Sequence, residues 1–340
     1  MRGRKITSAD VAARAGVSQS AVSRVFTPGA SASPRTVQKV RKAAAELGYR
    51  PNVIARTMAS GRSRIIGLVV AYLDNYFYPE ALEKLSKLLQ DRGYHVLLFM
   101  ASQTAENVDD IVERILDHQV DGIVAASAGL GSELSARCRA AGVPVVLFNR
   151  SQDDPSLSAV TSDNVAGGRR VAEFLLAGGH GRIAYIAGWE GASTQRDREF
   201  GFLAGLARGG AALHSRAAGE FRLETARTAA RVLFAGPDRP DAVFVANDHM
   251  AFGVMDVLRH ELGLSVPGDV SVVGYDDVPP AAWPAYDLTT VRQAATRMVA
   301  ETVAILIDQI EQACDEPRRI AISADLRVRG SARVPAGWSR

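Results

Sequence analysis

The chain has 340 residues, of which 47% are hydrophobic and 23% are charged, and its net charge is +3. Its two cysteines show no paired spacing and no apolar run reaches 18 residues, which excludes a disulfide scaffold and a membrane-spanning helix. The charge is uneven, because residues 1–64 hold 13 basic and two acidic side chains, a net charge of +11, while the remainder carries −8. A basic N-terminal region on an acidic body indicates nucleic-acid binding. A basic tail that binds acidic lipid is the alternative, but these charges are interleaved with a helical pattern.

Residues 7–26, TSADVAARAGVSQSAVSRVF, predict two short helices joined by a tight turn. Thr7 and Asp10 form a capping box, and Gly16 suits the left-handed turn that ends the first helix. Ser18 can cap the second helix through its hydroxyl. One face of that helix is apolar, and the opposite face carries Gln19, Ser20, Ser23 and Arg24, whose polar groups can reach base edges and phosphates. An ordinary amphipathic helical hairpin is the alternative.

A third helix completes this head. Ser33 and Pro34 are typical of a helix start, and Gly48 is typical of the left-handed residue after a helix end. The residues between them place Val37, Val40, Ala44 and Leu47 on one apolar stripe. Few of these side chains are large, so we expect an independently folded head of low stability.

The segment that follows the head, YRPNVIARTMASGRSR at 49–64, is apolar between two basic flanks. A helix this short is not stable alone in water, so we expect it to order only on a partner. Its composition suits a hinge helix that pairs with its twin and wedges into the minor groove. A plain linker is the alternative.

The combination of DVAxxAGVSxxxVSRVF, LGYRPNxxAR and IIGLVV resembles bacterial repressors of the lactose/galactose repressor (LacI/GalR) family, and the resemblance covers essentially the whole chain. It implies that Gln19, Ser20 and Arg24 read bases in the major groove. It further implies phosphate contacts from Thr7, Ser18, Ser23 and Asn52, and DNA contacts from Ala55 and Met58 in the hinge. Met58 stands where the family usually has an intercalating leucine, and Thr27–Pro28–Gly29 departs from the family's usual loop.

Seven apolar runs separated by helical stretches follow the hinge. They occupy residues 65–70, 95–100, 122–127, 144–149, 183–188, 242–247 and 271–276. Continuous apolar runs of this kind predict parallel strands that are buried on both faces, and the length favours two doubly wound lobes. Ligands of such sheets bind beyond the carboxyl ends of the strands, so we expect a cleft between the lobes.

Polar side chains follow several of these runs. Amide, carboxylate and guanidinium groups beside aromatic rings suit a cluster of sugar hydroxyls. The resemblance implies effector contacts from Asn149, Arg198, Asn247 and Asp276, with Phe77 and Tyr78 stacking on or walling the ligand. Asp163 and Trp283 are weaker candidates. A helix cap or a loop hydrogen bond is the alternative for each residue, and it is the favoured reading for Asp163, Ser127 and Trp283.

The expected domains are a helix-turn-helix head at 1–50, a hinge at 51–61 and a body at 62–340. The resemblance implies discontinuous lobes, one at about 62–160 and 291–322 and the other at about 161–290 and 323–340. It places the dimer contact on helices that start near Pro79 and Val108. The tail after Arg333 is too short for a heptad helix, so we expect a homodimer.

The sequence shows no HExxH, GxSxG or Walker pattern, so an enzyme, a metal site and a cofactor are not expected. A periplasmic-type sugar-binding protein, or a sensor that does not regulate DNA, is the alternative function. A signal segment is not seen, and a basic helical head stands in its place, which favours a cytoplasmic regulator. We therefore expect a repressor of double-stranded, pseudo-palindromic operator DNA. A small molecule, expected to be a sugar or sugar derivative, would control it through the hinges.

Overall fold

The computed structural model describes residues 6–26, 30–50, 62–101, 108–126, 132–312 and 316–339. The chain forms two compact units, Met1–Arg64 and Ile65–Arg340, which are called the head and the body here. Within the described ranges, none of the helices combines the length and apolar character of a membrane span.

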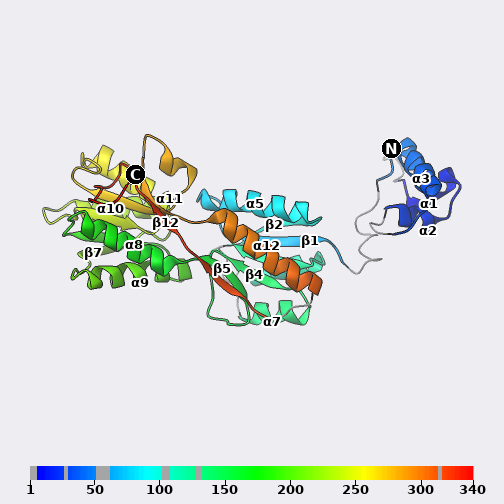
Figure 1. Cartoon of the computed structure of the whole chain (residues 1–340), viewed down its shortest axis with the longest axis horizontal. Helices are drawn as coiled ribbons and strands as arrows, with labels where there is room; N and C mark the ends of the chain where they lie inside the picture. The colour runs from blue at the N-terminus through cyan, green and yellow to red at the C-terminus, as the bar shows by residue number, and fades with distance from the viewer. Residues whose placement is uncertain are drawn as a thin grey trace. The chain divides into compact units, whose positions relative to one another are not determined.

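The head consists of the helices α1 (Ser8–Ala15), α2 (Gln19–Phe26) and α3 (Pro34–Leu47) (Figure 1). The predicted capping box is confirmed, because the Thr7 hydroxyl accepts from the Asp10 amide while the Asp10 side chain accepts from the Thr7 amide. Gly16 adopts the predicted left-handed conformation with a φ of 65°. The Ser33 hydroxyl caps α3 by accepting from Thr36, and Gly48 ends it with a φ of 67°.

The three helices of the head enclose one small core. Its fully buried members are Val11, Ala12, Val22, Val40, Ala43 and Ala44. Phe26 and Tyr49 close its rim, with ring centroids 5.9 Å apart. All six buried side chains are valine or alanine, so the core is small, and the predicted low stability of the head follows from it.

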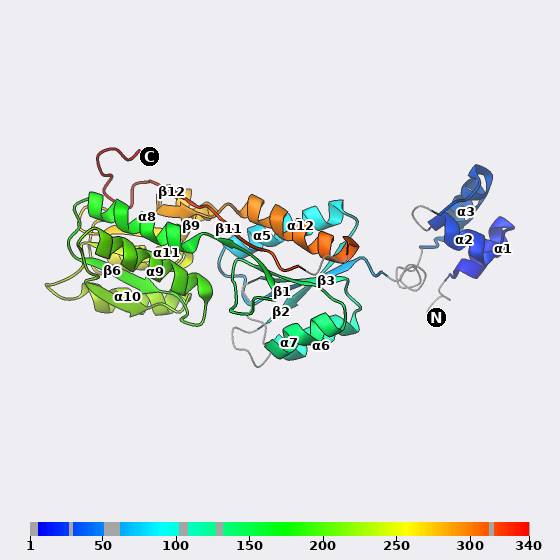
Figure 2. The same ribbon diagram turned by 60° about the horizontal axis from the view of Figure 1, so that its bottom comes forward.

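The first lobe of the body is built on a six-stranded parallel sheet in the order β11-β5-β4-β3-β1-β2. The strands are β1 (Ile65–Val70), β2 (His95–Met100), β3 (Gly122–Ala126), β4 (Val145–Phe148), β5 (Ser158–Ser162) and β11 (Arg319–Ile322). Helices α5 (Phe77–Asp91) and α12 (Ala295–Gln312) cover one face, and α6 (Val108–Asp117) and α7 (Ser132–Ala140) cover the other (Figure 2).

Side chains of the central strands alternate between these two faces. In β1, Leu68 and Val70 join the core under α5, while Val69 joins the core with Ile115 of α6. This period of two is the geometry of an extended strand, and burial on both faces explains the continuous apolar runs.

The strand β2 departs from the predicted burial. It lies at the edge of the sheet, and its side chains at Leu98 and Met100 remain 50% and 48% exposed. The expectation that every apolar run is buried on both faces is therefore wrong for this strand. A run of six apolar residues does not reveal whether its strand pairs on one side or on two.

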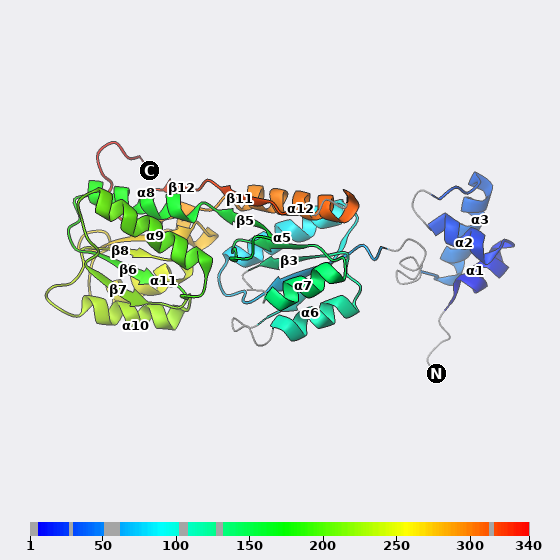
Figure 3. The same ribbon diagram turned by 90° about the horizontal axis from the view of Figure 1, so that it is seen from below.

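The second lobe has a six-stranded sheet in the order β12-β10-β9-β8-β6-β7, parallel except for the antiparallel edge strand β12. The strands are β6 (Ile183–Ala187), β7 (Ser215–Ala218), β8 (Ala242–Val245), β9 (Ser271–Asp276), β10 (Thr289–Arg292) and β12 (Asp325–Arg327). The helices are α8 (Asn164–Ala177), α9 (Ser193–Arg208), α10 (Leu223–Phe234) and α11 (Asp248–Asp256), with a π-helical turn (Val257–Glu261) after α11 and a 3-10 turn (Pro279–Ala282) (Figure 3).

Two strands of the body, one in each lobe, are too polar to stand out in the sequence. β5 reads SAVTS and β7 reads SRAA, and each lies beside an apolar strand.

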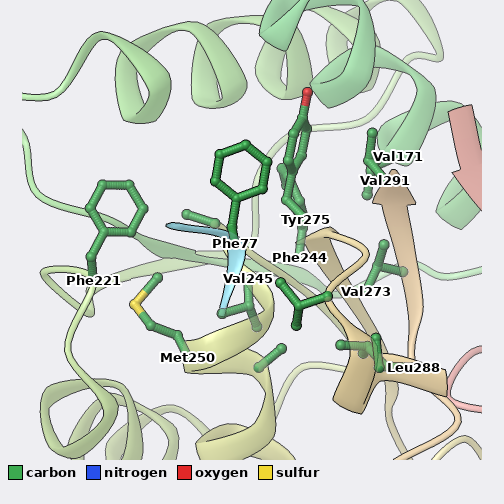
Figure 4. Close-up of a cluster of buried hydrophobic side chains, with 14 of the residues drawn as sticks. Phe77, Val171, Phe221, Phe244, Val245, Met250, Val273, Tyr275, Leu288 and Val291 are labelled. Atoms are coloured by element: carbon green, nitrogen blue, oxygen red, sulfur yellow. The ribbon is translucent and has the colours of Figure 1, made fainter. Parts of the chain in front are cut away.

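The core of the second lobe is dense with apolar side chains from the strands, among them Phe244, Val273 and Tyr275 (Figure 4). Met250 and Phe221 pack into the same cluster from outside the sheet.

Helices α8 and α9 pack backbone against backbone. A Cβ atom at Gly168 would overlap the Arg198 carbonyl oxygen, and one at Gly201 would overlap the Val165 carbonyl oxygen. Glycine at both positions is therefore what allows this close approach. The packing fixes the backbone of α9 at Arg198, a residue of the site described below.

The chain crosses between the lobes three times. It leaves the first lobe after β5, returns between β10 and α12, and leaves again between β11 and β12 (Figure 1). The carboxyl ends of β1 and β4 in the first lobe and of β6, β7, β8, β9 and β10 in the second supply most of the side chains of the site. Their contacts across the lobes are described next.

Candidate effector cleft and DNA-binding surface

The exposed face of α2 is the candidate DNA-reading surface. The side chains of Gln19, Ser20, Ser23 and Arg24 lie on it and are all exposed, while Val22 on the opposite face is fully buried. The Ser18 hydroxyl accepts from the Ala21 amide, so it caps α2 as its position predicted.

Polar contacts join the three helices of the head. The Gln19 side-chain amide donates to the Ser8 hydroxyl at 2.9 Å and so joins α2 to α1. Arg14 of α1 pairs with Glu46 of α3 at 2.6 Å. The arrangement presents a helix whose N-terminal end is polar and exposed, as insertion into a major groove requires. The predicted contacts Asn52, Ala55 and Met58, together with Thr27–Pro28–Gly29, lie outside the described residues.

Asp276 is the centre of the cleft between the lobes. Its Oδ1 accepts from Arg198 at 3.4 Å and from Gln293 at 2.7 Å, and its Oδ2 accepts from Asn75 at 3.0 Å. Asn75 follows β1 of the first lobe, whereas Asp276 ends β9 of the second, so this bond joins the two lobes. Burial raises the pKa of the Asp276 carboxyl, and the nearby Arg198 opposes that rise.

Arg198 reaches this carboxylate from the first half of α9. Its side chain is 2% exposed and lies over the Tyr275 ring, with the guanidinium carbon 3.7 Å from the ring centroid. It also donates to the Asn164 side chain at 2.9 Å and to the Ala246 carbonyl at 2.5 Å. These contacts hold the guanidinium in one orientation within the cleft.

Asp248 is a second buried carboxyl close to Asp276. It accepts from the Thr290 hydroxyl at 2.6 Å and from the Val278 amide at 3.0 Å. Burial, followed by repulsion from Asp276, raises the pKa of Asp248 to about 8. The raised pKa favours the protonated, neutral form of Asp248, which lowers the negative charge of the cleft.

Amide groups line the same region. Asn149 follows β4 with a φ of 69°, and its Nδ2 donates to the Tyr78 hydroxyl at 3.0 Å. Asn247 caps α11 by accepting from the Met250 amide at 3.0 Å. Among the described residues, no hydrogen-bond partner exists for Asn149 Oδ1, Asn247 Nδ2 or Gln293 Oε1, although all three atoms are buried. Buried polar atoms without partners are costly, so a ligand that supplies partners would be favoured here.

Arg150, next to Asn149, lies among aromatic rings of both lobes. Its guanidinium carbon is 5.8 Å from the ring centroid of Tyr72, 5.7 Å from that of Trp189 and 5.6 Å from that of Phe221. Its Nη2 donates to the Tyr72 hydroxyl at 3.1 Å. These rings form an aromatic box, defined here as Tyr72, Trp189 and Phe221, around a positive charge in the cleft.

A cavity of about 680 Å³ opens beside this cluster. Its lining includes Phe77, Asp276 and Gln293, so it shares a wall with the polar cluster. Phe77 and Tyr78 are both buried, and Phe77 lies parallel to Phe148 with ring centroids 6.1 Å apart. Phe77 thus forms a wall of the cavity, whereas Tyr78 positions Asn149 from behind.

The structure brings together Arg198, Asp276, Asn247, Asn149, Phe77 and Tyr78, and it gives the weaker candidates other surroundings or roles. Asp163 caps α8 by accepting from the Ala166 amide at 2.9 Å. Trp283 is 53% exposed after the 3-10 turn. Ser127 lies outside the described residues. The described ranges hold no group of three or more histidine, cysteine or acidic side chains arranged to bind a metal ion.

Several residues of the cluster were not predicted as effector contacts. Arg150 and Asp248 stand at strand ends that the sequence marks as polar, whereas six others had no signal of their own: Tyr72, Asn75, Trp189, Phe221, Thr290 and Gln293. Most follow the carboxyl end of a strand by a few residues, so a wider search of each strand end would have found them. Thr290 lies within β10 and could not have been found in this way.

Two family models match the chain. That of the bacterial regulatory proteins of the lacI family matches residues 7–52, and that of a periplasmic binding protein-like domain matches residues 172–332. The HTH-type transcriptional repressor PurR of Vibrio vulnificus is 30% identical over 330 residues, which are 96% of this chain and 98% of the relative. The ribose operon repressor of Escherichia coli K12 is 30% identical over 331 residues, 96% of this chain and 99% of the relative.

Solved structures show the same architecture. A lac repressor dimer bound to operator and an anti-inducer is 27% identical, with a TM-score of 0.87 over 96% of this chain and 99% of that one. A complex of the transcriptional regulator CelR with cellobiose is 31% identical, with a TM-score of 0.74 over 96% of this chain and 100% of that one.

Proposed function

The chain belongs to the lacI family of bacterial regulatory proteins, and from that premise we propose how its parts divide the work of a ligand-controlled repressor. It is a DNA-binding transcriptional repressor whose affinity for its operator is regulated by a bound effector. The head reads DNA, with Gln19, Ser20 and Arg24 facing base edges and Thr7, Ser18 and Ser23 facing phosphates. Asn52, Ala55 and Met58 of the hinge complete this set.

The effector binds in the cleft between the lobes. The observation that carries this assignment is the buried Arg198–Asp276 pair, which meets Asn75 of the opposite lobe at the carboxyl ends of the strands. Asn149 and Asn247 add unpartnered amide atoms that suit hydroxyl groups, and Phe77 walls the adjoining cavity. A sugar or sugar derivative fits these groups. Among the similar solved structures, the regulator CelR is in complex with cellobiose, and the lac repressor dimer is bound to operator and an anti-inducer.

Coupling follows from contacts that cross the cleft. The bond from Asn75 to Asp276 and the bond from the Ser151 amide to the Ser193 hydroxyl, at 2.9 Å, each join the two lobes. A ligand that binds Asp276 or Arg198 changes the balance of these contacts and so favours one arrangement of the lobes. In a homodimer that holds two heads on a pseudo-palindromic operator in the cytoplasm, such a change alters operator affinity.

A periplasmic-type binding protein, the alternative function, would not need the head. The capped helix-turn-helix with its polar, exposed recognition face favours the repressor instead.

A thermal-shift screen of the full chain against sugars and related metabolites tests the cleft assignment. A ligand that binds only the folded protein raises Tm in proportion to the logarithm of its concentration. The ligand found should then change the affinity for operator DNA, and Asp276→Ala should abolish that change. A ligand that raises Tm equally in Asp276→Ala would contradict the site.

A further inference from the structure

The loop between β6 and α9 is a part of the second lobe that meets the first lobe beside the cleft. It spans residues 188–192 and is called the β6–α9 loop here. The centroid of its Trp189 ring lies 5.7 Å from the guanidinium carbon of Arg150 in the first lobe. Directly after the loop, the Ser193 hydroxyl accepts from the Ser151 amide of the first lobe at 2.9 Å. The position of this loop therefore decides two contacts between the lobes.

Two glycines let aromatic rings lie directly on the backbone of the β6–α9 loop. A Cβ atom at Gly188 would overlap the Phe221 ring, and one at Gly191 would overlap the Trp189 ring. Glycine has the largest conformational freedom of all residues and contributes no side-chain contact. A five-residue loop with two glycines therefore needs bonds from outside to hold a single conformation.

Arg216 supplies such bonds from the neighbouring edge strand β7. Its Nη2 donates to Glu190 of the loop at 2.5 Å, and the same guanidinium donates to both carboxylate oxygens of Glu199 in α9, at 2.5 and 2.9 Å. A guanidinium that binds a carboxylate through two N–H groups has a fixed orientation. Arg216 thus ties the loop to the helix that carries Arg198, the partner of Asp276.

Glu199 continues this network beneath the loop. It accepts from the Gln195 side-chain amide at 2.7 Å, and the Gln195 Oε1 accepts from the Gly188 amide at 2.5 Å and from the Tyr185 hydroxyl at 2.8 Å. Gln195 is fully buried, and the Glu199 side chain is only 16% exposed. A carboxylate with so little access to water needs a cation beside it, and Arg216 is that cation.

From these contacts we propose that Arg216 is a positioning residue of the effector site. It holds the β6–α9 loop, and Trp189 with it, in place before the effector binds. The inference rests on the proposed function of the cleft and adds to it a residue of the edge strand. A wall that is already ordered loses less conformational entropy when a ligand binds, so the affinity is higher. The effect of Arg216 reaches the ligand through Trp189 and Arg198.

The fluorescence of Trp189 in the full chain tests the position of the loop without any effector. The chain has three tryptophans, so Trp283→Phe and Trp338→Phe together leave Trp189 as the only emitter. In this background Arg216→Gln should raise the acrylamide quenching constant about twofold, because the released loop opens locally and exposes the ring. Arg216→Lys keeps the charge but not the paired N–H groups, so it should restore part of the protection.

Arg231→Gln is the matched control. Arg231 donates to both carboxylate oxygens of Glu261 at 2.6 and 2.9 Å, and it lies on α10, which covers the opposite face of the sheet from α9 (Figure 3). Its loss should leave the quenching of Trp189 unchanged, and melting of each variant shows whether it folds. If Arg216→Gln lowers Tm but leaves the quenching unchanged, Arg216 only stabilises the fold and the proposal is wrong.

Calorimetric titration with cellobiose, D-glucose, D-galactose and D-ribose measures the effect on binding. A sugar that binds the unmodified chain should bind Arg216→Gln about three- to tenfold more weakly, the cost of ordering the loop and its side chains. The same sugar should bind Arg231→Gln as well as it binds the unmodified chain. Equal affinities for the two variants would contradict the proposal.

The two measurements separate this inference from the proposed function. If Arg216→Gln releases Trp189 while none of the four sugars binds the unmodified chain, the assignment of Arg216 to the loop holds and the cleft is not a site for these sugars. If a sugar binds all variants alike and the quenching of Trp189 does not change, the function of the cleft stands and Arg216 is not a positioning residue.

Discussion

The guanidinium of Arg198 and the carboxylate of Asp276 lie 3.4 Å apart, and each side chain is only 2% exposed. These residues come from the helix after β6 and from the end of β9, and they meet because both strand ends open into the cleft. The pair is therefore at once a structural link within the second lobe and, through Asn75, a link to the first lobe.

Asp276→Ala should abolish the response to effector while the head still binds DNA. The change leaves the buried Arg198 without its carboxylate, so we expect a loss of stability of about 3 kcal/mol or more. Operator binding is measured with and without ligand below the lowered Tm. Asp153→Ala, which removes the exposed partner of Arg196, is the matched control. A full ligand response in Asp276→Ala would show that the effector binds elsewhere.

Arg24→Ala should relax the preference of the repressor for its operator. Arg24 is exposed on the reading face of α2, and loss of one base contact costs about 1–3 kcal/mol of discrimination. Affinities for an operator selected from a random duplex library and for its point variants give the result. Equal discrimination in the variant and the unmodified chain would remove Arg24 from base reading.

Operator affinity should fall steeply as salt concentration rises. The first 64 residues carry a net charge of +11, and each phosphate that a basic side chain neutralises releases counterions. The slope of log affinity against log salt is measured by fluorescence anisotropy. A slope near zero would mean that the basic head does not contact the DNA backbone.

Gly168→Ala should destabilise the second lobe. The added methyl group would overlap the Arg198 carbonyl oxygen and lie 2.9 Å from the Phe202 amide nitrogen, both in the backbone. We expect a loss of about 1–3 kcal/mol, with weaker effector binding because α9 carries Arg198. Gly181→Ala is the control, since a Cβ atom there has open space. Thermal melting compares the two, and equal Tm values would contradict the backbone packing.

Asp248 should make the body less stable as pH rises from about 4 to about 8. The pKa of the Asp248 carboxyl is raised from its ordinary value of 3.8 to about 8 in the folded protein, so folding favours the protonated form. The contribution of the protonated Asp248 carboxyl to the free energy of unfolding is fully present below pH 4 and is lost as pH rises through 8. Asp248→Asn mimics the neutral side chain, and its Tm should depend less on pH across this range. Parallel Tm curves for the two proteins would show that Asp248 does not titrate there.

Much of the fold was predictable because it depends on local chemistry. The capping box at Thr7 and Asp10, the left-handed Gly16 and the start of α3 at Ser33 each involve residues within a few positions of one another. The central strands were predictable for a related reason, since burial on both faces leaves a continuous apolar run. Edge strands do not follow this relation between burial and apolar sequence: β2 is apolar although it is partly exposed, and β7 is polar. The sequence alone did not show which strands lie at the edges.

The sequence by itself determined the capped helices of the head, its basic charge, the apolar strands and the identity of the polar residues at their ends. Only the tertiary structure decided which of those residues meet. Asn75 and Asp276 are 201 residues apart, and their bond depends on three crossings of the chain between two separate sheets. Arg150 gains its aromatic box in the same way, from rings in both lobes. Such contacts are set by topology and packing, and no local pattern encodes them.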